Sequence, residues 1–410
     1  MDSLSQIVLG AAVGEAVLGR RIGNRAMIWG AVAGTIPDMD VLGKYFLSEL
    51  DNLAFHRGIS HSLLFCVLGS LVFGWVTDAL YRSRYHAWVA IVTKVAAAVI
   101  VGFVVNFLTQ ILAPGAWWPV AVYIPVVGYW AWKHGQSRYF QGNWKAPDAD
   151  LKGWVLLFFW GFLTHVLLDC FTTYGTQIFA PFSNQRVAWG TVSVVDPLYT
   201  LPFLGCLLMA ARFARDHSRR RIWNGLGLAW SCAYLSLTAV NRQIVHRTFE
   251  EALQEQGRSD NRFFIAPTIF NNLLWNAVVD SGDEFLLAQY SILDEVPIAF
   301  HPVSKGYDEL HNLETDETLG VLRWFSAGYF NAVRREDGSL QLNDLRFGTF
   351  SGRAEDADDY IFRFKLRDHG PTEPYGFEVA QGGPPEETAE EMMMDLFNRA
   401  RGLSPEDSPS

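Results

Sequence analysis

Residues 153–172 read GWVLLFFWGFLTHVLLDCFT, and this stretch decides the fold class. A helix of about 20 residues is roughly 30 Å long, which is enough to cross the hydrocarbon core of a bilayer. The stretch also holds His165 and Asp169, and ionisable groups in such a helix are costly unless they are paired or coordinated. Because residues four apart share one face of a helix, the sequence predicts a membrane helix that carries two metal-ligand side chains near its end.

Further apolar runs lie on both sides of this stretch. They place membrane segments near residues 4–19, 26–36, 61–81, 87–112, 116–132, 153–172, 193–214 and 222–241. The first two are short, so we expect them to be tilted, re-entrant or packed as half-helices, because irregular backbone at membrane depth is tolerated only where protein or water surrounds it. The predicted fold class is an all-α multi-pass membrane helical bundle of about eight segments, followed by a soluble domain.

The chain changes character near residue 245. Hydrophobic residues make up 50% of it, with 15 Trp and 29 Phe, but they gather in the first part and the charges gather in the second. The net charge of −10 therefore belongs mostly to the second part, which argues for its solubility and against a nucleic-acid partner. The four cysteines stand singly, without the spacing of a zinc ribbon or a disulfide framework. We expect a transmembrane domain over residues 1–245, a soluble domain over 250–402 and a disordered tail over 403–410.

Short apolar stretches separated by turn residues follow residue 250, which is typical of a small sheet-rich α+β domain. Residues 335–339, REDGS, predict a hairpin connection between two strands. Residues 385–402 predict a terminal amphipathic helix. The strand-like runs cover residues 285–290, 296–300, 321–333, 340–350 and 360–366.

The basic residues orient the bundle in the membrane. With the turn at residues 20–25 in the cytoplasm, the connections on that side carry 14 lysines and arginines, whereas the opposite loops carry only Lys44, Arg57 and Arg186. The positive-inside rule then places both termini, and with them the soluble domain, outside the cytoplasm. Glu15 should lie toward the cytoplasmic end, where we expect a structural pair with a nearby arginine.

This orientation brings four separate clusters of polar residues to one depth at the outer face. They are Pro37 to Asp40, His56 to Ser62, His165 with Asp169, and Asp196 near the start of the seventh segment. Imidazole and carboxylate together form a usual zinc shell and also suit manganese or iron. An isolated pair could equally be a helix-end histidine beside a carboxylate, so the prediction depends on the convergence. We predict one or two divalent metals, zinc first, with a ligand pool of Asp38, Asp40, His56, His61, His165 and Asp169.

Two further residues are candidates for catalysis. Arg57 lies between two histidines, and its planar guanidinium could clamp an anionic oxygen in the transition state. It could equally pair with a nearby carboxylate, that of Asp38, Asp40 or Asp51. Asp196 is a candidate general base or an additional metal ligand.

Three of these motifs resemble the YdjM-like, LexA-regulated family of membrane-bound metal-dependent hydrolases. They are Pro37 to Asp40, His56 to Ser62, and His165 to Asp169 with its continuation to Gly175, and the string His-Arg-Gly-x-x-His-Ser is the most specific. The resemblance covers about residues 1–205, and the polar half is similar to the C-terminal extension of larger members. It implies a multi-pass protein of the bacterial inner membrane with a metal-hydrolase site. Many relatives carry a histidine where this chain has Gln6, so one ligand is missing or replaced by an amide.

The sequence therefore predicts a membrane-bound metal-dependent hydrolase that acts at the outer face on a lipid or lipid-linked ester, with a phosphoester favoured. The rival function is that of a transporter or ion-binding membrane protein, in which the same residues form a permeation or proton-relay path. Against this rival, the polar residues gather at one depth and no inverted repeat is visible. Metal content combined with turnover of a lipid phosphoester would separate the two functions.

Overall fold

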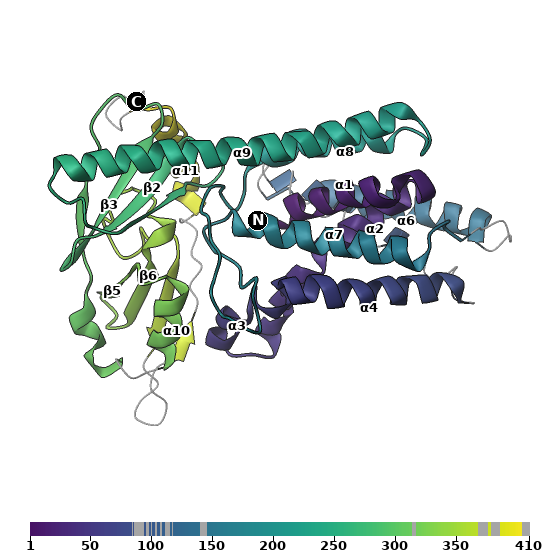
Figure 1. Cartoon of the computed structure of the whole chain (residues 1–410). Helices are drawn as coiled ribbons and strands as arrows, with labels where there is room; N and C mark the ends of the chain where they lie inside the picture. Colours follow the sequence, from purple (N-terminus) through teal and green to yellow (C-terminus); the bar gives the residue numbers. More distant parts are fainter. Residues whose placement is uncertain are drawn as a thin grey trace.

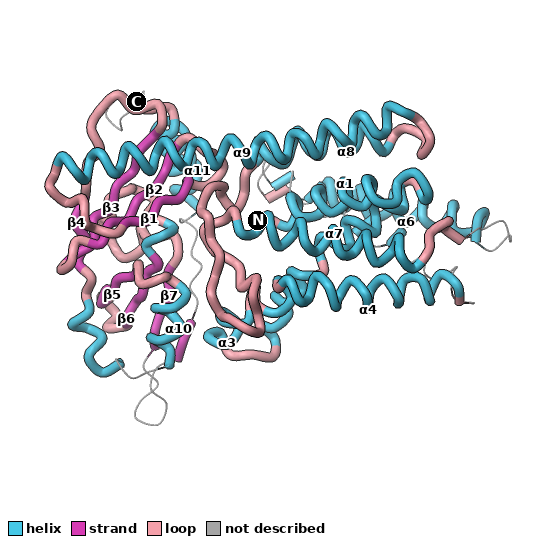
Figure 2. Tube along the Cα trace, viewed as in Figure 1, coloured by secondary structure: helices cyan, strands magenta, loops and turns pink. Residues whose placement is uncertain are grey.

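A helical bundle forms one end of the molecule and a sheet domain forms the other, with one long helix running through both (Figure 1). The computed structural model describes residues 1–83, 118–139, 146–313, 317–367, 376–378 and 386–403, with short stretches between 85 and 116. Figure 2 shows the strands together at one end of the molecule, and all of them come from the second half of the chain. The predicted order of a helical part followed by a sheet-rich part is therefore confirmed.

Helices form close to the predicted apolar runs. Among the residues that the structure describes, α4 and α7 are long and apolar enough to cross a membrane and α8 is a shorter apolar helix, so the expected eight spans are not confirmed. The expected segment at 87–112 lies mostly outside the described residues, and its described residues between 94 and 110 are helical. The helices of this part are α1 (Ser3–Ile22), α2 (Asn24–Thr35), α3 (Glu49–Phe55), α4 (Leu63–Arg82), α6 (Trp118–Tyr139), α7 (Leu151–Cys170), α8 (Pro197–Ala211) and α9 (Ser218–Glu255).

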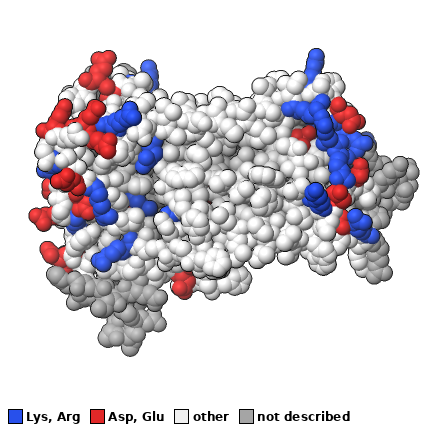
Figure 3. Space-filling model, in the orientation of Figure 1, with Lys and Arg blue, Asp and Glu red and all other residues white. Residues whose placement is uncertain are grey.

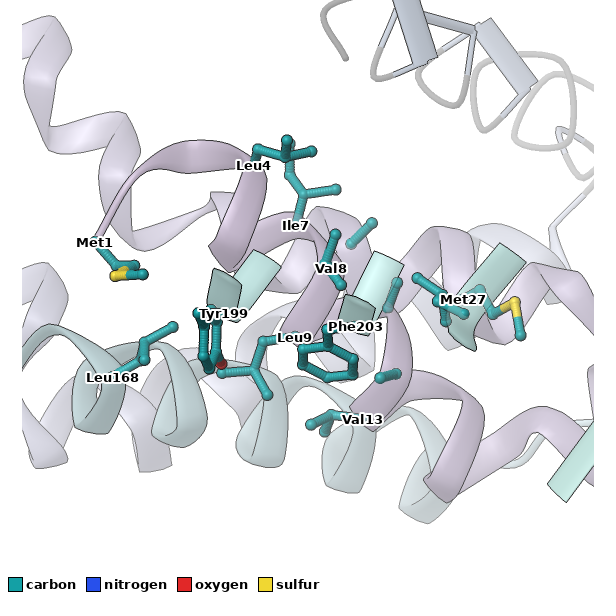
Figure 4. Close-up of a cluster of buried hydrophobic side chains, with 14 of the residues drawn as sticks. Met1, Leu4, Ile7, Val8, Leu9, Val13, Met27, Leu168, Tyr199 and Phe203 are labelled. Atoms are coloured by element: carbon teal, nitrogen blue, oxygen red, sulfur yellow. The ribbon is translucent and has the colours of Figure 1, made fainter. Parts of the chain in front are cut away.

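Helix α1 is the central helix of the bundle, packed against α2, α7, α8 and α9. Its apolar side chains Leu4, Val8 and Leu9 belong to a buried cluster with Tyr199 and Phe203 of α8 (Figure 4). On another side α1 meets α2 at glycines, and a Cβ added to Gly30 would lie only 2.2 Å from the carbonyl oxygen of Gly10. The two backbones therefore touch directly, which fixes α2 and the segment after it against α1.

Two short 3₁₀ segments connect α2 to α4. The first, η1 (Pro37–Tyr45), follows α2 directly, and the second, η2 (Ile59–His61), precedes α4. The hydroxyl of Ser62 accepts a hydrogen bond from the backbone N–H of Phe65 and so caps α4. His61 is consequently left just outside the helix that the sequence assigned to it.

On the face drawn in Figure 3, charged residues gather at the two ends of the molecule and leave an uncharged belt between them. At the basic end, buried Glu15 of α1 forms an ion pair with Arg220 of α9, whose Nη2 lies 2.5 Å from Oε2. Arg220 also donates to Asn24 Oδ1 at 2.6 Å. The expected structural pair of Glu15 is present, but its partner comes from α9 and not from the arginines that neighbour it in the sequence. The orientation across a membrane stays a prediction.

Helix α9 passes without a break through residues 245–250, where the sequence placed a domain boundary. Val245, Phe249 and Leu253 recur at helical spacing, and all three are buried in clusters with residues of the first sheet. This apolar stripe extends the helix into the second domain, because burying it requires the sheet as its partner.

Two antiparallel four-stranded sheets make up the second domain. The predicted hairpin at residues 335–339 is confirmed, because Arg334 pairs with Leu340 across it. The first sheet holds β1 (Phe263–Pro267), β2 (Leu274–Asp280), β3 (Glu284–Ser291) and β4 (His301–Ser304), and the second holds β5 (Phe330–Arg334), β6 (Leu340–Asp344), β7 (Arg363–Arg367) and β8 (Gly376–Glu378).

Two of the strand-like runs prove to be something else. Residues 296–300 form no strand, and the run at 321–333 starts as helix α10 (Glu317–Phe325) before it becomes β5. The helix forms because Leu319, Leu322 and Phe325 bury one face. The predicted terminal helix is present as α11 (Glu386–Ala400), and residues 404–410 of the expected tail lie outside the described residues.

Candidate metal centre

Three segments meet at the end of the bundle that faces the sheet domain (Figure 1). η1 supplies Asp38, η2 supplies His61, and the last turns of α7 supply His165 and Asp169. One potential ligand atom from each of these four side chains lies within 4.8 Å of all the others. The structure thus brings together four of the six residues in the predicted ligand pool.

Five of the six distances between these donor atoms are those expected between ligands of one metal ion. The Nε2 atoms of His61 and His165 are 3.1 Å apart. Asp38 Oδ1 lies 3.4 Å and 3.5 Å from these two nitrogens. Asp169 Oδ2 lies 3.4 Å and 3.3 Å from them. Ligands held at about 2.0 to 2.1 Å from one tetrahedral ion are about 3.3 to 3.4 Å from each other, so each carboxylate already stands at ligand spacing from both histidines. The two carboxylate oxygens lie within 4.8 Å of each other.

Both histidines are oriented by their second ring nitrogen. His165 Nδ1 lies 2.8 Å from the carbonyl oxygen of Gly34, which can only accept, so Nδ1 carries a proton and Nε2 faces the other three donors. His61 Nδ1 lies 3.2 Å from Asp40 Oδ2 and 3.0 Å from Ser60 Oγ. Asp40 therefore acts behind His61 and stands outside the four-donor cluster. Sequence reasoning could not find Gly34, because a backbone carbonyl leaves no signature in a residue pattern.

His56 also stands outside the four donors. Its Nδ1 lies 2.8 Å from Asp40 Oδ1, and its ring packs edge-on against Tyr174 at a centroid distance of 5.3 Å. The ring of His56 is 6.3 Å from that of His61, centroid to centroid. The structure thus places His56 and Asp40 as a hydrogen-bonded pair beside the centre.

Asp169 presents two different oxygens. Oδ1 binds Gln6 Nε2 at 3.1 Å, Arg57 Nη2 at 3.0 Å and the main-chain nitrogen of Met1 at 2.5 Å. Oδ2 is buried, has no hydrogen-bond partner and faces the two histidines. A buried carboxylate oxygen without a partner is costly, and a cation at this point would satisfy it. Gln6, which the family resemblance singled out, therefore holds the Asp169 carboxylate through its amide.

Arg57 is held by the same carboxylate. Its side chain also donates from Nη1 to Thr172 Oγ1 at 3.0 Å, and its backbone N–H donates to Asp40 Oδ2 at 2.8 Å. The residue has a φ of 57°, a left-handed conformation that costs a non-glycine residue about 1 kcal/mol or more. The sequence left two roles open for Arg57, an anion clamp and a partner of a nearby carboxylate. In the structure its side chain has a carboxylate partner, and this partner is Asp169 in place of the expected Asp38, Asp40 or Asp51.

The pKa shifts of His61 and Asp38 indicate a site that favours positive charge. Burial by itself would lower the pKa of His61, but the neighbouring carboxylates of Asp169, Asp38 and Asp40 outweigh burial and raise the pKa to about 10. Burial would raise the pKa of Asp38, but the charge of His165 and hydrogen bonds from both histidines hold the pKa well below its usual range. The Asp38 carboxylate is therefore ionised, and either protons on the histidines or a divalent ion can supply the balancing positive charge.

Asp196 lies elsewhere. Its Oδ1 accepts hydrogen bonds from the backbone N–H groups of Leu198 and Tyr199 and so caps α8, and its Oδ2 accepts from the hydroxyl of Tyr234 at 2.8 Å. None of these partners is a donor of the four-residue cluster. The contacts explain Asp196 as a helix cap, and they give no support to the predicted role as ligand or general base.

Comparison with known proteins gives one match. A family model described as YdjM inner membrane protein matches residues 1–143 and 117–245, which together span the helical part of the chain. No curated protein and no solved structure matches the chain. The family resemblance read from the motifs is confirmed, and the sheet domain lies beyond the matched residues.

Proposed function

This chain belongs to the YdjM family of inner membrane proteins, and we propose that it is a metal-dependent hydrolase acting on a lipid or lipid-linked phosphoester at the outer face of the bacterial inner membrane. The observation that carries the proposal is the four-donor cluster. Two imidazole nitrogens and two carboxylate oxygens lie within 4.8 Å of one another, and one of those oxygens is buried without a partner. Such a donor set favours zinc, with manganese or iron as alternatives.

Four residues would bind the metal in this proposal, and one of them marks the open side of the centre. Asp38, His61, His165 and Asp169 would hold the ion, which supplies Lewis-acid polarisation and a means of ionising water near neutral pH. Asp38 is the donor whose side chain is partly exposed, at 23%, whereas the other three are fully buried. The open side of the centre, from which a substrate could approach, is therefore the side of η1.

The surface beside Asp38 supports a lipid as the substrate. Met39, Tyr45 and Phe46 in and after η1 are exposed, and Phe46 is exposed to 86%. Apolar exposure continues at Ile59 and along α4, where Leu63, Leu64, Val67 and Leu68 also face outward. An exposed apolar patch next to a polar centre favours contact with acyl chains over contact with water.

Arg57 has two functions in this proposal. Its Nη atoms hold Asp169 and Thr172, while its Nε is buried and has no hydrogen-bond partner. We assign Nε to an anionic oxygen of the substrate. At saturating metal, Arg57→Ala should lower turnover by about 10²- to 10³-fold, and Arg57→Lys should recover only part of it, because an ammonium cannot reproduce the planar fork.

The test uses the full-length protein in lipid nanodiscs. Metal content is measured for the wild type, His165→Ala, a His61→Ala/His165→Ala double variant and the control His301→Ala, whose histidine lies in β4. We expect bound metal in the wild type and in the control and its loss in the other two, with hydrolysis of phosphatidylglycerol lost in parallel. Stoichiometric metal in the double variant would refute the site, and a metal-loaded wild type that cleaves no lipid phosphoester would refute the lipid phosphoesterase function.

A further inference from the structure

The sheet domain, which lies beyond the residues matched by the family, packs against the segments that carry the metal centre. Leu53 of α3, three residues before His56, is buried in the core of the second sheet together with Phe325 and Phe362. Tyr174, in the loop after α7, packs against the same core. At the end of α10, Trp324 Nε1 donates to the carbonyl oxygen of Asn184 in that loop at 3.1 Å. Both segments are thus held by the second domain.

Tyr174 stands at the centre of this contact. The guanidinium carbon of Arg57 lies 4.9 Å from the centroid of its ring, and that of Arg186 lies 4.7 Å from it. The ring of Phe325 packs edge-on against Tyr174 at a centroid distance of 4.9 Å. The same Tyr174 ring contacts His56. One aromatic side chain therefore contacts the sheet domain, the pair of His56 with Asp40, and the arginine that holds Asp169.

The contact continues into the sheet domain as alternating rings and cations. Arg186 also lies over Phe325, at 5.1 Å, and Arg346 lies over the same ring at 5.4 Å. Arg346 is anchored by Asp344, Nη2 to Oδ2, at 2.6 Å. Among the described residues no carboxylate forms an ion pair with Arg186, whose partners are aromatic rings and the carbonyl oxygens of Tyr174 and Gly175. Guanidinium groups over aromatic faces hold both partners in place.

We propose that the sheet domain completes the metal centre: Phe325 fixes the ring of Tyr174, and Tyr174 fixes Arg57 and His56. Phe325, Tyr174 and Arg186 are positioning residues, because they act on the ligands only through Arg57 and Asp40. The inference rests on the metal centre of the proposed function. The left-handed backbone conformation of Arg57 supports this inference. Such a conformation persists in a non-glycine residue only where surrounding contacts enforce it.

The test reads the metal itself, with Co²⁺ as the probe in the full-length protein. The visible absorption of bound Co²⁺ reports ligand geometry, and its titration reports affinity. The test variants are Tyr174→Leu, Phe325→Leu and Arg186→Lys. The controls are Tyr174→Phe, which keeps the ring, and Phe285→Leu, which changes an equally buried phenylalanine of the same domain in a different cluster.

We expect the test variants to change the Co²⁺ spectrum and to weaken Co²⁺ binding by about 10- to 100-fold, the usual effect of removing a group that orients a ligand. Tyr174→Phe and Phe285→Leu should behave as the wild type. Wild-type spectra and affinity in Phe325→Leu or in Tyr174→Leu would overturn the inference and leave the proposed metal site standing. An equal change in the control Phe285→Leu would overturn it in the same way. A wild type that binds no Co²⁺ would instead overturn the proposed metal site and, with it, this inference.

Discussion

Replacing Gly30 with alanine should push the first two helices apart. The new Cβ would lie 2.2 Å from the carbonyl oxygen of Gly10 and 2.8 Å from the Cα of Gly14, and both neighbours are backbone atoms that cannot rotate away. An ordinary contact begins at about 3.4 Å, so α1 and α2 must separate by about 1.2 Å at this level. Overpacking of this kind costs about 1 to 3 kcal/mol, and a backbone contact belongs at the upper end of that range.

The separation should also reach the metal centre. Gly34 in α2 accepts the hydrogen bond that orients His165, and Gln6 in α1 donates to Asp169. Moving the two helices apart disturbs both hydrogen bonds, so metal affinity should fall about 10- to 100-fold. The control is Gly225→Ala in α9, where a Cβ would meet nothing within 4 Å. That change should leave metal binding intact and stabilise the helix by about 0.5 to 1 kcal/mol.

Both quantities can be measured on protein in detergent micelles, stability by unfolding in increasing denaturant and affinity by metal titration. A Gly30→Ala protein as stable as the wild type and with the same metal affinity would show that α1 and α2 are not in backbone contact. Destabilisation without a change in affinity would show that the glycine contact does not position the ligands.

Two further predictions follow from the charges of the bundle. Glu15→Gln should destabilise the protein by about 3 to 5 kcal/mol, because it leaves Arg220 buried without its charged partner. A Glu15→Leu/Arg220→Met double variant should recover most of that loss. Equal stability of Glu15→Gln and the wild type in a denaturant titration would contradict this. Reporter fusions after Arg215 should report the cytoplasm and fusions after Leu403 the outside, because the loops near Arg215 belong to the side with 14 basic residues; a cytoplasmic signal from Leu403 would reverse the orientation.

Local sequence determined the helices and part of the site. Apolar length alone predicted α4 and α7, because a helix satisfies its backbone hydrogen bonds within one segment. The spacing of four residues placed His165 and Asp169 on one face of α7, since helical periodicity is a local property. The turn residues at 335–339 likewise predicted a hairpin that depends only on its own two strands.

Tertiary structure decided which residues of the predicted pool meet. Sequence proposed six ligands, and packing brought four donors to ligand spacing while it left Asp40 and His56 behind them and Asp196 at the cap of α8. The distance between helices depends on how closely they pack, which here is set by glycine contacts such as that of Gly30 with Gly10. No residue pattern within one segment encodes that distance.

The same reason explains what sequence could not predict about the second domain. Residues 321–325 form a short, mostly apolar stretch whose pattern fits a strand and a helix equally, and the helix forms because its buried face packs against the second sheet. Likewise α9 continues past residue 250 because Val245 and Phe249 pack against the first sheet. The contact of Phe325 with Tyr174 joins residues more than a hundred positions apart, and only the folded chain brings those two rings together.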